Sequence, residues 1–180
     1  MQPLIVRIEE VFPELPIPDM TLRQAQLADE TLDREISPEE WDATGRIDRP
    51  VIWKDIEPAV LIACDAALSH ISEVGFVYYI PAYMRLALNQ LAGVANPEWE
   101  AFGSTVFHLT DRSNYTIARF KRFSDAQIDT VIDFLRHIRA AGGFEGNMAE
   151  EALKAYWETP EVRRRTIIHM TSSAYSPFRW

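Results

Sequence analysis

The chain has 180 residues, of which 47% are hydrophobic and 25% are charged, a composition typical of one globular domain. Its formal net charge is −9 at pH 7, and residues 1–100 hold 18 acidic and 7 basic side chains. This balance argues against nucleic-acid binding, which depends on neutralising phosphates, and we expect neither nucleic acid nor membrane among the partners. We interpret the acidic residues mainly as a solvated surface.

The chain contains a single cysteine, Cys64, so an intramolecular disulfide is impossible. The N-terminus lacks a basic region followed by a long apolar stretch, so we expect no signal peptide and a cytoplasmic location. Asp65 disfavours a thiolate at its neighbour, which predicts a buried structural cysteine rather than a nucleophile. Polar residues interrupt the apolar runs at 59–68 and 76–92, which we interpret as core helices rather than membrane spans.

The first fifty residues carry three helix patterns. Residues 4–12 place apolar side chains at helical spacing, and the prolines in 13–18 then predict an extended loop. Thr21 and Gln24 form a capping-box pattern that opens a short helix. Residues 37–45 begin with a Ser-Pro-Glu-Glu start signal and end at a glycine, which predicts another helix.

The middle of the chain is predicted to form two apolar helices separated by Gly75. The first covers residues 55–72 and the second residues 76–92. Pro81 lies inside the second helix and is expected to kink or restart it, because proline donates no backbone hydrogen bond.

Residues 104–120 have an ambiguous pattern. Strand-forming side chains at 105–107 and 115–117 flank the turn-like residues 111–114, which predicts a short β-hairpin as an alternative to helix. The predicted fold is therefore mainly α: a single-domain multi-helix globule over residues 1–180. One short β-hairpin near residues 104–120 is left open as an alternative to helix.

The strongest helix pattern runs from Ser124 to about residue 141. Ser124 and Gln127 form a capping box, and the glycines that follow the helix end it. One face carries Ile128, Val131, Ile132, Leu135 and Ile138. Further helices are predicted over 147–158 and 159–170, followed by an extended tail from about residue 171.

No arrangement of residues predicts a catalytic centre. The four histidines, at 70, 108, 137 and 169, are not spaced as metal ligands, so we expect no metal and no cofactor. No glycine-rich phosphate loop and no nucleophile elbow is present. We assign no catalytic residue, and enzymatic activity is left open as the less favoured alternative.

Four residues are the candidates for ligand or partner binding: Trp53, Tyr79, Tyr83 and Arg119. The two tyrosines lie one helical turn apart on either side of Pro81, where a freed backbone carbonyl and two hydroxyls favour a small pocket. The alternative is that the two tyrosines belong to an aromatic core and bind no ligand. Arg119 belongs to a basic cluster that either binds an anion or pairs with the acidic half of the chain.

Three motifs together resemble a family of uncharacterised bacterial proteins known only as a domain of unknown function. They are the tryptophan–acid pattern at 53–56, the Tyr-Tyr-Ile-Pro-Ala-Tyr helix at 78–83, and the pattern from Phe120 to Gln127 that runs into the helix through Leu135. The resemblance covers about residues 50–140. It implies the existence of the domain and no activity, cofactor or catalytic residue.

Two functions follow from these observations. The first is a small acidic binding protein without catalytic activity, whose partner is another protein or a second copy of the chain. The second is a small enzyme or ligand-binding protein with a pocket beside the Tyr79-Pro81-Tyr83 kink, where Asp65 is a further candidate.

Overall fold

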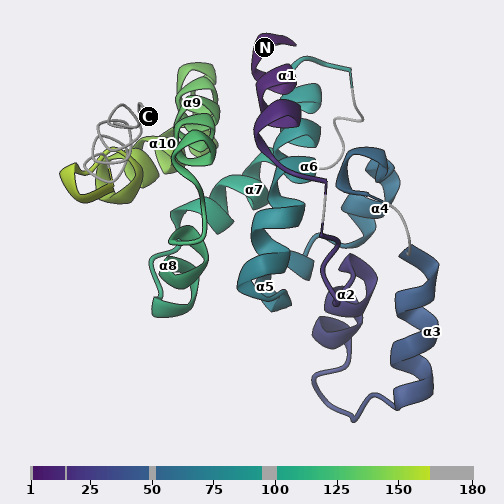
Figure 1. Cartoon of the computed structure of the whole chain (residues 1–180). Helices are drawn as coiled ribbons and strands as arrows, with labels where there is room; N and C mark the ends of the chain where they lie inside the picture. The colour runs from purple at the N-terminus through teal and green to yellow at the C-terminus, as the bar shows by residue number, and fades with distance from the viewer. Residues whose placement is uncertain (1, 15, 49–51, 95–100, 163–180) are drawn as a thin grey trace, which may run out of the picture.

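A computed structural model describes residues 2–14, 16–48, 52–94 and 101–162 (Figure 1). Every regular element in these ranges is helical, which confirms the mainly α prediction. The elements before residue 95 are α1 (Gln2–Val11), α2 (Leu22–Glu30), α3 (Pro38–Asp48), the 3-10 turn η1 (Trp53–Asp55), α4 (Pro58–Ala63), α5 (Ala67–His70) and α6 (Glu73–Leu91). Those after residue 100 are α7 (Ala101–Thr110), α8 (Asn114–Phe120), α9 (Asp125–Ala141), α10 (Gly143–Ala152) and the π-helical turn η2 (Leu153–Trp157). The predicted tail from about residue 171 lies outside the described residues.

Helix α6 lies at the centre of the molecule and packs against α1, η1, α4, α5, α7 and α8 (Figure 1). Thirteen of its 19 residues are buried, as expected for a helix that is apolar on all sides. The Ser72 side chain accepts a hydrogen bond from the Gly75 amide and so caps the helix at its start. The helix continues through Pro81 as one element, so of the two expected effects, a kink or a restart, the restart does not occur. Proline cannot donate a backbone hydrogen bond, and packing against the neighbouring helices offsets this loss.

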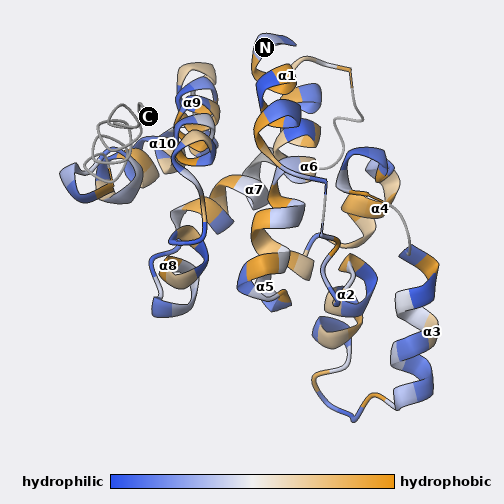
Figure 2. Ribbon diagram, viewed as in Figure 1, coloured by the Kyte–Doolittle hydropathy of each residue, from blue (hydrophilic) through white to orange (hydrophobic). Residues whose placement is uncertain are grey.

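Helices α2 and α3 pack against each other at one end of the molecule, and α3 is mostly hydrophilic along its length (Figure 2). The predicted capping box of Thr21 and Gln24 is present. Gly45 does not end α3, which continues to Asp48. A Cβ atom at Gly45 would lie 2.5 Å from Nε2 of Gln24, so this glycine permits close packing of the two helices.

The predicted helix over residues 55–72 is divided into α4 and α5, and the 3-10 turn η1 ends at residue 55, where that helix was expected to begin. Helix α4 ends at Ala63, and α5 begins only at Ala67. The carbonyl of Cys64 lies in this break and accepts a hydrogen bond from the Tyr83 hydroxyl. A tertiary hydrogen bond therefore stabilises an interruption that apolar spacing alone does not predict.

The β-hairpin considered for residues 104–120 is wrong, because these residues lie in α7, α8 and the turn between them. The Ser113 side chain accepts a hydrogen bond from the Thr116 amide and caps α8. In α7, Val106 and Leu109 are almost completely buried. Tertiary packing of α7 against α6 and α10 thus overrides the strand preference of the β-branched residues.

Helix α9 agrees closely with its prediction. The Ser124–Gln127 capping box is present, and the helix ends at Ala141 before Gly142, which has a φ of 80°. The predicted face is buried: Ile128, Val131, Ile132, Leu135 and Ile138. The predicted helix over 147–158 begins earlier, at Gly143, and passes into the π-helical turn η2.

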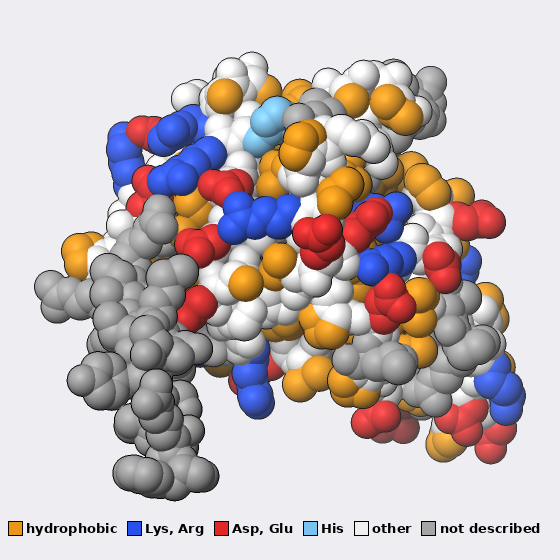
Figure 3. Space-filling view, turned by 45° about the horizontal axis from the view of Figure 1, so that its top comes forward, with side chains coloured by type: hydrophobic (Ala, Val, Ile, Leu, Met, Phe, Trp, Pro, Cys, Tyr) orange, Lys and Arg blue, Asp and Glu red, His pale blue; other side chains and the backbone are white. Residues whose placement is uncertain are grey.

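Charged side chains of α1, α9 and the residue that follows η2 pair with one another. Arg7 donates to Asp133, Arg136 lies 3.4 Å from the same carboxylate, and Arg136 also contacts Glu158 at 2.6 Å. On the face drawn in Figure 3, acidic and basic side chains are intermixed rather than separated into large patches of one sign. Some of the charged side chains therefore form ion pairs within the molecule.

Candidate functional site

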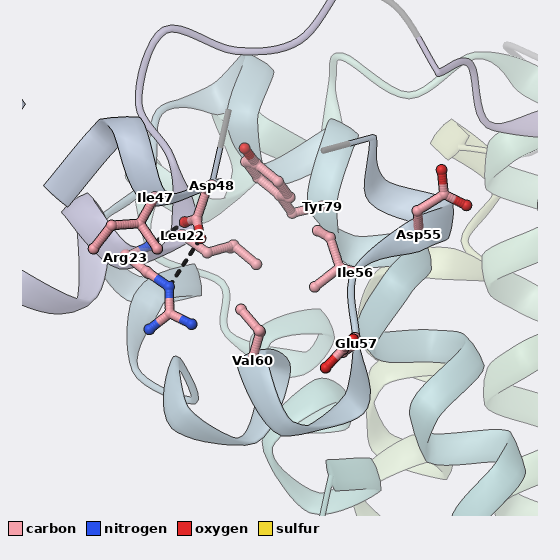
Figure 4. A pocket seen from close by; sticks show the side chains of 9 residues that line it. All are labelled: Leu22, Arg23, Ile47, Asp48, Asp55, Ile56, Glu57, Val60 and Tyr79. Carbon is pink, nitrogen blue, oxygen red and sulfur yellow. Dashed lines mark hydrogen bonds and ion pairs between the residues drawn. The ribbon is translucent and has the colours of Figure 1, made fainter. Parts of the chain in front are cut away.

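A pocket lies beside Tyr79, between α2, the end of α3, the start of α4 and helix α6 (Figure 4). Its volume is about 200 Å³. Three apolar side chains from different elements, Leu22, Ile56 and Val60, point toward one another across it (Figure 4). The remaining lining residues are Arg23, Ile47, Asp48, Asp55, Glu57 and Tyr79.

The rim of this pocket is acidic. Asp48 accepts hydrogen bonds from the Arg23 side chain at 2.9 Å and the Arg23 amide at 3.1 Å, so its charge is balanced locally. Asp55 and Glu57 are exposed, and no basic side chain in the described ranges pairs with either. Figure 4 shows the Asp55 carboxylate directed away from the pocket, whereas Glu57 lies on the rim next to Val60.

Trp53 is fully buried and joins α1 to α6. Its indole Nε1 donates to the carbonyl of Pro13 at 3.0 Å, and its amide donates to the hydroxyl of Tyr78 at 3.3 Å. The Tyr78 hydroxyl in turn donates to the Glu14 carbonyl at 3.0 Å. Lys54 adds an ion pair to the Glu14 carboxylate at 2.7 Å. Trp53 therefore connects the segment after α1 to helix α6, and it does not line the pocket beside Tyr79.

A second pocket, of about 300 Å³, lies between α4 and α6 and includes Trp53 and Arg85. Arg85 is already engaged: it donates to the Lys54 carbonyl at 3.0 Å and lies 3.3 Å from the Glu9 carboxylate. Ile56 lines both pockets and separates them. The remaining walls of the second pocket are almost entirely apolar: Pro58, Leu61, Ile62, Ala82, Leu86, Asn89 and Val94.

Tyr83 and Cys64 are buried together and line neither pocket. Burial raises the pKa of the Tyr83 hydroxyl well above its usual value. Burial likewise raises the pKa of the Cys64 thiol to about 11. A thiol with that pKa stays protonated at neutral pH, as expected for a structural cysteine.

Arg119 is 2% exposed and binds the end of α5. Its guanidinium donates to the carbonyls of Leu68, Ser69 and Ile71, which helix α5 leaves without backbone partners. The same group lies over the rings of Phe76 and Tyr115, 4.9 and 3.9 Å from their centroids. These contacts place Arg119 in the interior, away from both pockets.

His108 is 8% exposed, and burial followed by the nearby charge of Arg119 lowers its pKa to about 4. The imidazole is therefore neutral at pH 7. Within the described parts of the chain, no group of three or more His, Cys, Asp or Glu side chains is arranged to hold a metal ion. Within the same parts, no helix is both long enough and apolar enough to cross a membrane.

The structure brings only one of the four sequence candidates, Tyr79, to the first pocket. Sequence reasoning did not identify Glu57 or the Arg23–Asp48 pair as its neighbours. One local signal was available, because Asp55 and Glu57 are two acids that flank an apolar residue just before Pro58, in a helix-start context. No local pattern in the sequence indicates that residues of α2 and α3 form the rest of the pocket wall.

Comparison with known proteins gives a family without an assigned activity. Searches of curated proteins and of solved structures found no match. A family model described as a family of unknown function, DUF6714, matches residues 1–161, which is most of the chain. The expected relation to a domain of unknown function is confirmed, and the chain belongs to the DUF6714 family.

Proposed function

We propose that this protein is a small binding protein, and that the pocket beside Tyr79 is its ligand site. The observation that carries the proposal is the convergence of Leu22, Ile56 and Val60 on a concave space with polar groups at its rim. Ligand sites commonly combine apolar walls with a few polar groups in this way. The single cysteine supports a cytoplasmic location for this activity.

Binding without catalysis is favoured by where the perturbed groups lie. Large pKa shifts are found at Cys64, Tyr83 and His108 in the described part of the chain, and none of these three residues lines the pocket. A catalytic acid or base is expected to have a shifted pKa and to face the substrate. The groups that line the pocket are apolar walls with a few polar side chains at the rim, which suits the binding of a ligand.

The experiment is a titration of the full chain with benzyl alcohol, a neutral probe, followed by amide chemical shifts in NMR spectra. We expect saturable shifts for residues around Val60. The Val60→Phe variant fills the pocket and should abolish the shifts, whereas Ala59→Phe adds the same ring at an exposed neighbouring position and should preserve them. Equal binding by both variants, with both shown to be folded by their thermal transitions, would refute the site.

A second candidate function is binding to another protein or to a second copy of the chain. It is favoured by two large apolar side chains in the acidic half, Leu32 and Ile47, which are 79% and 65% exposed. Sedimentation of the full chain over a concentration series tests the second copy. An increase in mass that Ile47→Asp removes would support self-association, and a constant monomer mass would exclude it.

A further inference from the structure

The size of the pocket restricts the ligand that the proposed site accepts. An apolar cavity of about 150 Å³ can hold a molecule as small as benzene. The Tyr79 pocket has a volume of about 200 Å³, which leaves room for one ring or a short alkyl chain and a small head group. A larger ligand would extend past the rim into solvent.

The charges at the rim favour one sign of head group. Asp48 is neutralised by Arg23, which leaves Asp55 and Glu57 without a basic partner among the described residues. An anionic ligand would meet repulsion from these carboxylates, and a cationic ligand would gain an ion pair with Glu57 at the rim. Asp55 faces away and contributes only at longer range (Figure 4).

Tyr79 adds a second group that suits a cation. Its side chain lines the pocket and is only 3% exposed, so the ring forms part of the wall rather than of the outer surface. An ammonium group close to an aromatic ring is attracted by the electrons of the ring, and the attraction is larger when water is excluded. Figure 4 draws Tyr79 and Glu57 on opposite sides of the pocket, so the ring and the rim carboxylate would each attract a bound cation from its own side.

We infer that the ligand of the Tyr79 pocket is a small organic cation: a primary ammonium group on a short apolar body. This inference rests on the proposed function, because it assigns the ligand class of the same site. The apolar body packs between Leu22, Ile56 and Val60. The ammonium group remains at the rim, near Glu57.

The test compares three probes of similar shape: benzylamine, benzyl alcohol and benzoate, each titrated into the full chain at pH 7 and low ionic strength. Benzylamine should bind roughly fivefold to tenfold more tightly than benzyl alcohol, as expected for one rim ion pair with an aromatic contribution. Benzoate should bind more weakly than the alcohol. Alcohol or benzoate binding at least as tightly as the amine would overturn the ligand class and leave the proposed site intact.

Three variants assign the preference to a residue. Glu57→Gln should reduce benzylamine affinity to about that of benzyl alcohol, and it should lower the alcohol affinity much less than the amine affinity. Asp55→Asn should have a smaller effect. Glu39→Gln removes the same charge from an exposed position of α3 outside the pocket and is the matched control. An equal loss with Glu57→Gln and Glu39→Gln would contradict the inference, whereas failure of all three probes to bind would refute the proposed function itself.

Discussion

The hydroxyl of Tyr83 donates a hydrogen bond to the backbone carbonyl of Cys64, and this contact connects the central helix α6 to the break between α4 and α5. Both residues are almost completely buried, so no solvent can replace the bond. Tyr83→Phe removes the hydroxyl and retains the ring. We expect the free energy of unfolding to fall by about 0.5–1.5 kcal/mol, because the hydroxyl bond is lost while the Ala67 amide still donates to the same carbonyl. Urea denaturation measures this, and an unchanged midpoint would show that the hydrogen bond contributes nothing.

Arg119 should be far more important for stability than an exposed arginine nearby. Replacing Arg119 by methionine removes the donor that binds the carbonyls at the end of α5, and we expect a loss of about 2–4 kcal/mol. Arg122→Met is the control, because Arg122 forms an exposed pair with Glu73 and should change stability by about 1 kcal/mol or less. Arg119→Lys should recover only part of the loss, since lysine lacks the planar donor geometry. Equal effects of the two methionine variants in urea would contradict the assigned role.

His108 should make the protein sensitive to acid. Burial depresses its folded-state pKa to about 4, whereas an unfolded histidine titrates near 6.5. The unfolded state therefore binds more protons in this interval. Stability from the neutral imidazole is complete above about pH 6.5 and is lost as the pH falls toward 4, by about 3 kcal/mol in total.

The His108→Leu variant removes the titrating group and retains an apolar side chain. Between pH 7 and pH 4.5 its stability should fall less steeply than that of the unmodified protein. Urea denaturation at several pH values compares the two slopes. Parallel curves would show that the pKa of His108 is not lowered in the folded protein.

Leu135 and Leu32 form a matched pair for testing the core. Leu135 is completely buried in α9, whereas Leu32 is 79% exposed. Leu135→Ala should cost about 2–5 kcal/mol through lost burial and the cavity that remains. Leu32→Ala should change stability by about 0.5 kcal/mol or less. Similar denaturation midpoints for the two variants would contradict the packing of α9.

Local sequence patterns predicted the elements whose stability is decided locally. The capping boxes at Thr21 and Ser124, and the buried face through Leu135, all depend on residues within a few positions of one another. Residues 104–120 were ambiguous because strand preference depends strongly on the surroundings of a residue. Here packing against α6 and α10 decides the outcome. The break at Cys64 likewise depends on Tyr83, a residue from another helix.

The candidate site was only partly predictable for the same reason. Tyr79 was identified through its position beside Pro81, but the pocket also needs Leu22 from α2 and the Arg23–Asp48 pair that joins α2 to α3. Such contacts arise from tertiary packing and leave no pattern in a single sequence. Arg119 illustrates the converse, because a basic cluster does not reveal that one member donates to backbone carbonyls inside the molecule.

The central claim is that the pocket beside Tyr79 binds a ligand, and intermolecular nuclear Overhauser effects test it most directly. The full chain with labelled methyl groups is mixed with benzylamine, and contacts from the ring protons of the probe to protein methyl groups are recorded. The account predicts contacts to the methyl groups of Leu22, Ile56 and Val60, which converge on the pocket. Contacts confined to Ile62 and Leu86, which line the second pocket, or no contacts at all, would contradict it.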